Sequence, residues 1–128
     1  GPNQRKQSLI PYIIDCLKKN KPINIKNPNN CLDFIFVKDI ATYFKKIISL
    51  SPSSGIYNVS TGSCVRIFNI FQILKKLINK KYKYNLSTNS RNSISFFGGN
   101  KKTIKRVFFK PKYNIQAGLK KTIQNLND

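Results

Sequence analysis

Residues 31–48 read CLDFIFVKDIATYFKKII, and this stretch is the strongest indication of the fold class. Its first part, from Cys31 to Val37, is a largely apolar run of the length that a buried strand needs. Asp39 then stands where a carboxylate favours the start of a helix. Apolar residues follow at helical spacing, namely Ile40, Tyr43, Phe44, Ile47 and Ile48. A buried strand that leads straight into an amphipathic helix is typical of an α/β fold.

The same alternation of helices and short strands extends over the rest of the chain. Ser8 can cap a first helix and Asn114 a last one. Helical periodicity predicts helices over residues 8–19, 67–78 and 115–126, with a short helical stretch at 103–107. Short apolar runs predict strands at 23–25, 56–59, 82–86 and 94–97. The sequence therefore predicts one small α/β domain over residues 1–128, built from helices and short strands.

The net charge of +20 arises from 24 lysine and arginine residues against four acidic ones. Such a surface attracts anionic substrates and binds phosphate polymers non-specifically, so a small basic nucleic-acid-binding protein is one alternative. We favour a different explanation, because the excess is almost all lysine and accompanies abundant Asn and Ile, and these three residues share A/T-rich codons. The lysines also occur in scattered pairs along the expected helices, as on solvated helix faces. We therefore expect no nucleic-acid partner.

Few residues are suited to catalysis or metal binding. The chain has no histidine, and its three cysteines (Cys16, Cys31 and Cys64) are too widely spaced to form a metal-ligand set. We expect these cysteines to be reduced thiols. Paired carboxylates, a nucleophile beside a base, and glycine-rich dinucleotide or phosphate loops are all missing, so we expect no catalytic and no cofactor-binding residue here. The turn at residues 60–63, STGS, is either a generic anion site or merely a cap.

Targeting signals are not evident in the sequence. No apolar run approaches the roughly 20 residues that span a bilayer, and the first five residues lack a signal-peptide core. We therefore expect a cytoplasmic protein without a membrane partner. The chain contains no methionine, so we also expect it to be a fragment or a processed product.

Five groups of short motifs resemble a known family. They are GPNQ at 1–4 with SLIP at 8–11, KPI at 21–23, LDFIFVKDIA at 32–41, GIYNVSTG at 55–62, and FKPKY at 109–113 with GLKKTI at 118–123. In order and spacing they are similar to the C-terminal part of the NAD-dependent epimerase/dehydratase family, the extended short-chain dehydrogenases/reductases that modify sugar nucleotides. The resemblance covers nearly the whole chain.

The resemblance implies a division of labour between two halves of a parent enzyme. An N-terminal Rossmann half, absent from this chain, would bind NAD and carry the Tyr-x-x-x-Lys catalytic pair. The C-terminal half, residues 1–128 here, would form the lid that binds the nucleotide-diphosphate sugar while the other half does the redox chemistry. The parent enzyme would be a homodimer.

The resemblance also implies contacts to the substrate. Leu9 and Ile10, at the start of the first helix, would line the nucleotide pocket through their backbone. Ile25 and Lys26 would border the base, and Asn58 matches a family asparagine near the nucleotide.

Two further positions concern the diphosphate. Arg91 matches the late-loop arginine that pairs with the diphosphate, a charge-assisted fork suited to phosphate, or it is a solvated loop residue. Leu32 stands at the substrate-binding position where the family usually has a phosphate-binding arginine, so one fixed positive charge is missing. We expect Asp33 and Asp39 to be structural residues, at a strand end and a helix start, rather than catalytic ones.

Overall fold

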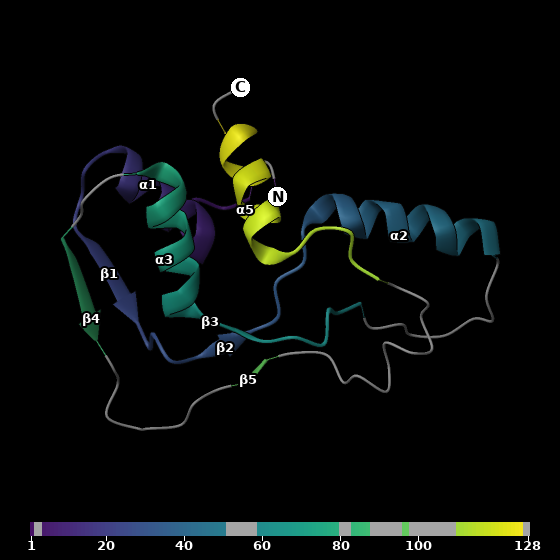
Figure 1. Ribbon diagram of the computed structural model, residues 1–128, viewed down its shortest axis with the longest axis horizontal. Helices are drawn as coiled ribbons and strands as arrows, with labels where there is room; N and C mark the ends of the chain where they lie inside the picture. Colours follow the sequence, from purple (N-terminus) through teal and green to yellow (C-terminus); the bar gives the residue numbers. More distant parts are fainter. Residues whose placement is uncertain (2–3, 51–58, 80–82, 88–95, 98–109, 127–128) are drawn as a thin grey trace.

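The computed structural model describes residues 1, 4–50, 59–79, 83–87, 96–97 and 110–126 (Figure 1). The core of this part is formed by two helices, α1 (Leu9–Lys18) and α3 (Ile67–Ile78), packed beside the strand β1 (Ile23–Lys26). The last helix, α5 (Ile115–Gln124), lies against α3. All three helices and β1 agree with the elements that the sequence predicts, to within a few residues at their ends.

The side chains that α1, α3 and β1 bury are those of their apolar repeats. Six of them are fully shielded from solvent: Ile13, Leu17, Ile23, Ile70, Phe71 and Leu74. Burial of one such side chain contributes about 1.5–3 kcal/mol to stability, so this cluster is the main source of stability in the described part of the chain. Leu119 of α5 joins the same cluster and is 2% exposed.

Two small sheets flank this core. In one, β1 pairs in parallel with β4 (Tyr84–Ser87), and Ile23 and Ile25 point inward while Asn24 and Lys26 are exposed. In the other, β2 (Cys31–Leu32) lies between β3 (Val65–Arg66), to which it is antiparallel, and β5 (Phe96–Phe97), to which it is parallel. The chain is thus a mixed α/β fold with short strands, as predicted.

The expected strand over residues 31–37 is much shorter than its apolar pattern suggested. Only Cys31 and Leu32 are in β2, and α2 (Val37–Leu50) already begins at Val37. Directly after β2, the carboxylate of Asp33 accepts hydrogen bonds from the backbone of Thr61 and Gly62. Residues 34–36 then lead into α2, so Asp39 lies inside the first turn of the helix rather than in front of it.

The starts of α1, α3 and α5 differ in how they are capped. The helix α3 does not follow the turn at 60–63 directly, because β3 lies between them, and its N-cap Arg66 makes no side-chain capping bond. Ser8 is the N-cap of α1 but its side chain does not cap, whereas Asn114 Oδ1 accepts from Ala117 N at 2.9 Å.

The strand expected at 56–59 and the helix expected at 103–107 lie largely or wholly outside the described residues.

The expectation of three reduced thiols is wrong for two of them. Cys31 and Cys64 form a disulfide, with Cα atoms 5.4 Å apart. The sequence separation of 33 residues hides this pairing, which arises because β2 and β3 are antiparallel neighbours. Cys16 is a free, buried cysteine, as expected.

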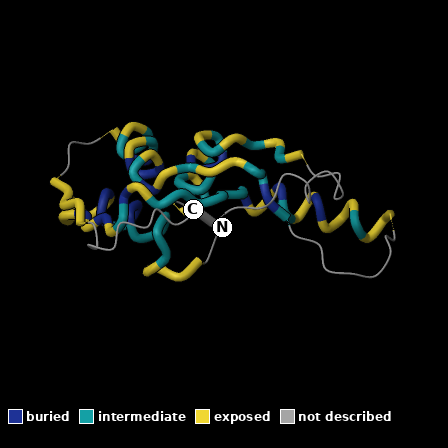
Figure 2. The backbone as a smooth tube through the Cα atoms, turned by 90° about the horizontal axis from the view of Figure 1, so that it is seen from below, coloured by how far each residue is buried: buried dark blue, intermediate teal, exposed yellow. Residues whose placement is uncertain are grey.

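The helix α2 extends away from the rest of the described chain (Figure 1) and makes few contacts with other elements. Its first turn is anchored, but its far end is mostly exposed in Figure 2. The apolar side chains left uncovered there include Phe44 (55% exposed), Ile48 (77%) and Leu50 (60%). Tyr43 in the middle of α2 is buried at 3% exposure, so the apolar face of the helix is covered there and uncovered at Phe44, Ile48 and Leu50.

Candidate functional site

A cavity of about 270 Å³ lies where the N-terminal segment, the link between β2 and α2, and α5 meet. Leu9 and Ile10 of α1 form one side of it, residues 33–37 form the second, and α5 with the two residues before it forms the third. The lining mixes apolar side chains with polar groups such as those of Gln4, Asn114 and Thr122. A concave, mainly apolar site with a few polar groups is the usual form of a small-molecule pocket.

Close packing of α5 against residue 36 shapes one wall of the cavity. A Cβ atom placed on Gly118 would lie 3.2 Å from the Cβ of Phe36, so a glycine allows the two segments to approach. The Phe36 ring meets the Tyr113 ring edge to face, with centroids 5.1 Å apart. At the opposite end, a Cβ on Gly1 would come within 2.9 Å of Val37 Cγ1, so the first residue of the chain also packs tightly. Both glycines belong to the motifs quoted above.

Asp39 ties the start of α2 to the segment that leads into α5. Its side chain is only 4% exposed, and its two carboxylate oxygens accept hydrogen bonds from Lys112 N and Tyr113 N, each at 3.1 Å. Both oxygens of this buried carboxylate are thus satisfied by backbone donors. Asp39 therefore positions Tyr113 on the cavity wall.

The carboxylate of Asp33, which lines the cavity, also accepts hydrogen bonds from a distant part of the chain. Its carboxylate accepts from Thr61 N and Gly62 N at 2.9 Å and from Thr61 Oγ1 at 2.6 Å. Gly62 has φ 69°, a conformation suited to glycine, and the turn there aims its N–H groups at the carboxylate. The anion that the turn at 60–63 binds is therefore the chain's own Asp33. As expected, both aspartates hold structure together.

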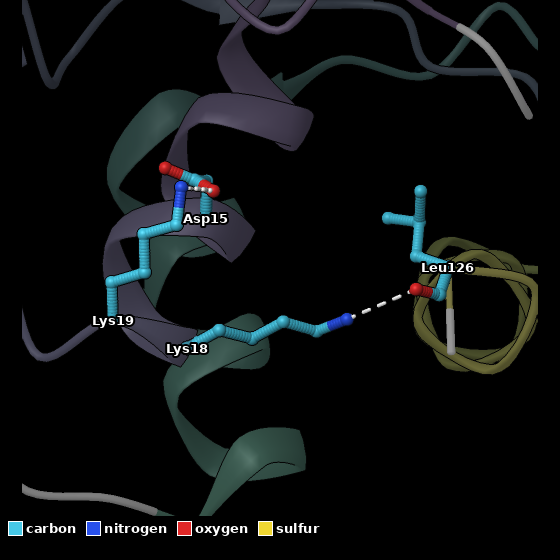
Figure 3. Close-up of polar contacts among 4 residues, drawn as sticks. All are labelled: Asp15, Lys18, Lys19 and Leu126. Carbon is cyan, nitrogen blue, oxygen red and sulfur yellow. Dashed lines mark hydrogen bonds and ion pairs between the residues drawn. The ribbon is translucent and has the colours of Figure 1, made fainter.

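The electrostatic surroundings of the cavity are basic, although the lining itself carries no lysine or arginine side chain among the described residues. Lys121 Nζ lies 5.4 Å from the ring centroid of the lining residue Tyr113. On the far side of α1, Lys18 Nζ donates to the carbonyl of Leu126 at 3.2 Å, and Lys19 pairs with Asp15 at 2.6 Å (Figure 3). The hydrogen bond from Lys19 lowers the pKa of Asp15.

Of the expected substrate-binding residues that the structure describes, Leu9 and Ile10 line this cavity. Ile25 is 2% exposed in the core, and Lys26 is an exposed residue at the end of β1. Leu32 is half-buried in β2, between β3 and β5. None of these three lines the cavity, and their roles stay predictions.

Asn58 and Arg91 lie outside the described residues, so their predicted contacts stay predictions too. Sequence reasoning did not identify the remaining walls of the cavity, residues 34–37 and α5. The one available signal was Gly118, a glycine within an otherwise helical repeat, which often marks a close approach of two segments.

Metal binding and membrane insertion find no support in the described part of the chain. It contains no group of three or more His, Cys, Asp or Glu side chains that could hold a metal ion. Among the same residues, no helix combines the length and the apolar character that crossing a bilayer demands.

Known proteins resemble this chain in sequence and in fold. No family model matches the chain. A CDP-abequose synthase of Salmonella typhimurium is 28% identical over 134 residues, which cover 98% of this chain and 45% of the synthase. A trifunctional UDP-glucose 4,6-dehydratase/UDP-4-keto-6-deoxy-D-glucose 3,5-epimerase/UDP-4-keto-L-rhamnose-reductase of Arabidopsis thaliana is 25% identical over 127 residues, 96% of this chain and 19% of that protein. The chain is therefore similar to members of the NAD-dependent epimerase/dehydratase family.

Solved structures of the epimerases and dehydratases have the same fold. The UDP-glucose 4-epimerase of Thermus thermophilus, solved as a complex with NAD, superposes with a TM-score of 0.81 at 17% identity. The match covers 99% of this chain and 43% of the epimerase. The family resemblance and the α/β fold class inferred from the sequence are thus confirmed. The chain spans less than half the length of these relatives.

Proposed function

We propose that residues 1–128 are the substrate-binding part of an NAD-dependent enzyme that modifies the sugar of a nucleotide sugar. The names of the relatives support this proposal, since they act on CDP- and UDP-linked sugars. The observation that carries it is the cavity beside Leu9 and Ile10, the two residues that the family resemblance assigns to the nucleotide pocket.

The size of the cavity indicates how much of a substrate this part could enclose. Pockets that bury a whole drug-sized ligand usually measure about 300–1,000 Å³, and this cavity has about 270 Å³. It therefore suits one portion of a nucleotide sugar, either the nucleoside or the hexose. Gln4 and Asn114 on its lining offer hydrogen-bonding groups for sugar hydroxyls or for the polar edge of a base.

Phosphate charge would be met by groups outside the lining. Lys121 is the basic residue seen next to the cavity wall, and the net charge of +20 attracts an anionic ligand at long range. Arg91 remains our proposed partner for the diphosphate, as a charge-assisted pair.

NAD would be held by another part of the parent protein. The present sequence has neither a G-x-G-x-x-G loop nor a Tyr-x-x-x-Lys pair, so its residues do not fit the cofactor. The role that we propose for this chain is to bind and orient the sugar nucleotide and to exclude water above it. Redox chemistry at the sugar would belong to the part that the relatives have in addition.

The uncovered face of α2 supports a contact with that additional part. Phe44, Ile48 and Leu50 expose large apolar surfaces that a stable folded protein normally covers. A second copy of the same chain is a poor occupant, because both copies carry +20. The cofactor-binding part of the parent enzyme is the occupant that fits the proposed function.

Calorimetric titration with CDP-, UDP-, dTDP- and GDP-sugars in the presence of NAD tests the proposal on the whole protein that carries this sequence. We expect one sugar nucleotide to bind, and Gly118→Val to weaken it at least about tenfold by filling the cavity beside Phe36. Gln116→Val is the matched control, because it adds the same side chain at an exposed position of α5.

Thermal melting of both variants shows whether they fold. A folded Gly118→Val variant that binds like the wild type would show that this cavity is not the site. Absence of binding by any sugar nucleotide, with salt-sensitive binding of polynucleotides instead, would contradict the proposed function and favour the nucleic-acid alternative.

A further inference from the structure

Two cysteines of this chain join the segments that hold the Asp33 side of the cavity. Cys31 is the first residue of β2, and Cys64 directly precedes β3. Their Cα atoms are 5.4 Å apart, within the range of about 4.4–6.8 Å that a disulfide requires. The backbone of the β2–β3 pair therefore places the two residues correctly for bonding.

The same two segments are joined a second time by hydrogen bonds. Asp33, two residues after Cys31, accepts from Thr61 N, Gly62 N and Thr61 Oγ1, just before Cys64. Asp33 lines the cavity, and residues 34–37 continue its wall. The disulfide and the hydrogen bonds to Asp33 thus both tie the start of the wall formed by residues 33–37 to residues 61–64.

Accessibility differs among the three cysteines. Cys64 is exposed, Cys31 is half-buried, and Cys16 is buried in the core at 6% exposure. An external thiol attacks a disulfide through its more accessible cysteine, and Cys64 is the more exposed residue of this pair. Cys16 belongs to the main core cluster, forms no disulfide and serves as an internal control.

We propose that Cys31 and Cys64 form a reversible thiol–disulfide pair that is reduced by dithiols and sets how firmly the Asp33 wall of the cavity is held. A thiolate of the dithiol attacks Cys64 Sγ, forms a mixed disulfide and releases Cys31 as a thiolate, which takes up a proton. The second thiol of the reductant then displaces the Cys64 thiolate, which is also protonated, and the reductant leaves as its own disulfide. Two electrons and two protons have then passed to the protein; an oxidised dithiol reverses both steps.

In the reduced state the two segments are joined by the Asp33 hydrogen bonds and the β2–β3 pairing, without the covalent bond. We expect the Thr61–Gly62 turn to open more often, because the covalent bond no longer limits the separation of the two segments. The redox pair stands on the described geometry; its effect on ligand binding rests on the proposed function.

Alkylation and mass measurement on the whole protein test the pair itself. Without reductant, Cys16 alone of these three cysteines is expected to be alkylated in the unfolded protein, and after dithiothreitol treatment all three, as read from the masses of the peptides that contain them. Alkylation of all three without reductant, in protein equilibrated with oxidised dithiol, would overturn the proposal.

Amide hydrogen exchange at Thr61 and Gly62 tests the link to the cavity wall. We expect exchange to become at least about tenfold faster on reduction, and equally fast in Cys31→Ser and Cys64→Ser, whereas Cys16→Ser keeps the redox response. Equal exchange rates in the oxidised and reduced protein would show that the pair does not control the wall. If reduction speeds the exchange of these amides but neither redox state binds a sugar nucleotide, the proposed function is wrong and the proposed redox pair is supported.

Discussion

The core around α1 and α3 and the projecting helix α2 have the same kind of sequence but opposite surroundings. Both regions carry apolar residues at helical spacing. In the core, Phe71 and Leu74 are completely buried, whereas in α2, Phe44 is 55% and Ile48 77% exposed. The difference lies in the partners: α3 packs on α1, β3 and α5, and α2 is held mainly at its first turn. An amphipathic repeat thus predicts a face that needs cover but not what covers it.

The largest expected effect is in the core. Phe71→Ala should lower the free energy of unfolding by about 3–5 kcal/mol, because it removes buried surface and leaves a cavity. Phe44→Ala in α2, as the matched control, should change it by no more than about 0.5 kcal/mol in this chain. Urea unfolding followed by circular dichroism measures both, and Ile70→Val provides a milder core variant if Phe71→Ala does not fold. Equal losses for Phe71 and Phe44 would mean that α2 is covered.

A smaller loss is expected where α2 is anchored. Asp39→Ala leaves Lys112 N and Tyr113 N without their acceptor, and we expect a cost of about 3 kcal/mol from two charge-assisted hydrogen bonds. Hydrogen exchange of these two amides should accelerate, while amides in α3 should keep their protection. If α3 amides lost protection to the same degree, α2 and the core would be a single cooperative unit.

The third prediction concerns the uncovered face. Ile48→Ser should leave the stability of this chain unchanged, since the side chain is already 77% exposed. In the whole protein that includes a cofactor-binding part, the same change should cost about 1–2 kcal/mol, as for a buried interface residue. Thermal melting of both forms makes the comparison, with Lys46→Ser as the control on the same helix. No difference between the two forms would argue against docking of that part on α2.

The smallest effect is expected at the surface of α1. Asp15 pairs with Lys19, which lowers the pKa of Asp15 in the folded state. The pair therefore stabilises the fold above the unfolded pKa of about 3.9, and this contribution is lost as the pH falls through the folded pKa. Asp15→Asn should cause a slight loss of stability at pH 7 and none in strong acid, measured by urea unfolding at both pH values. A larger loss in acid than at pH 7 would have the wrong sign for this pair.

Local patterns predicted the helices well because a helix is determined largely by residues within four positions of each other. The apolar stripes of α1, α3 and α5 and the cap at Asn114 were all recognisable before the structure was known. The strand at 31–37 was predicted too long, since a run of apolar residues does not show that Asp33 binds a turn 28 residues away. The expectation of reduced thiols was wrong for Cys31 and Cys64 for a similar reason, because their pairing depends on the register between β2 and β3.

The cavity, too, was predicted only in part from the sequence. The family motif at Leu9 and Ile10 indicated one of its sides, whereas the sides formed by residues 34–37 and by α5 were not foreseen. Those walls meet through contacts between distant segments, such as the bonds from Lys112 and Tyr113 to Asp39, 73 and 74 positions earlier in the chain. No periodicity in the sequence reports such a contact.

The sequence by itself determined the alternation of helices and short strands, the large positive charge and the relationship to the epimerases and dehydratases. These properties depend on local periodicity, composition and motif order, which a linear chain displays directly. Only the tertiary structure decided which apolar faces are covered, that Cys31 bonds to Cys64, and that Asp33 and Asp39 are acceptors for distant backbone amides. Each of these depends on two segments meeting in space, and the free energy of that contact is a property of the folded chain rather than of either segment alone.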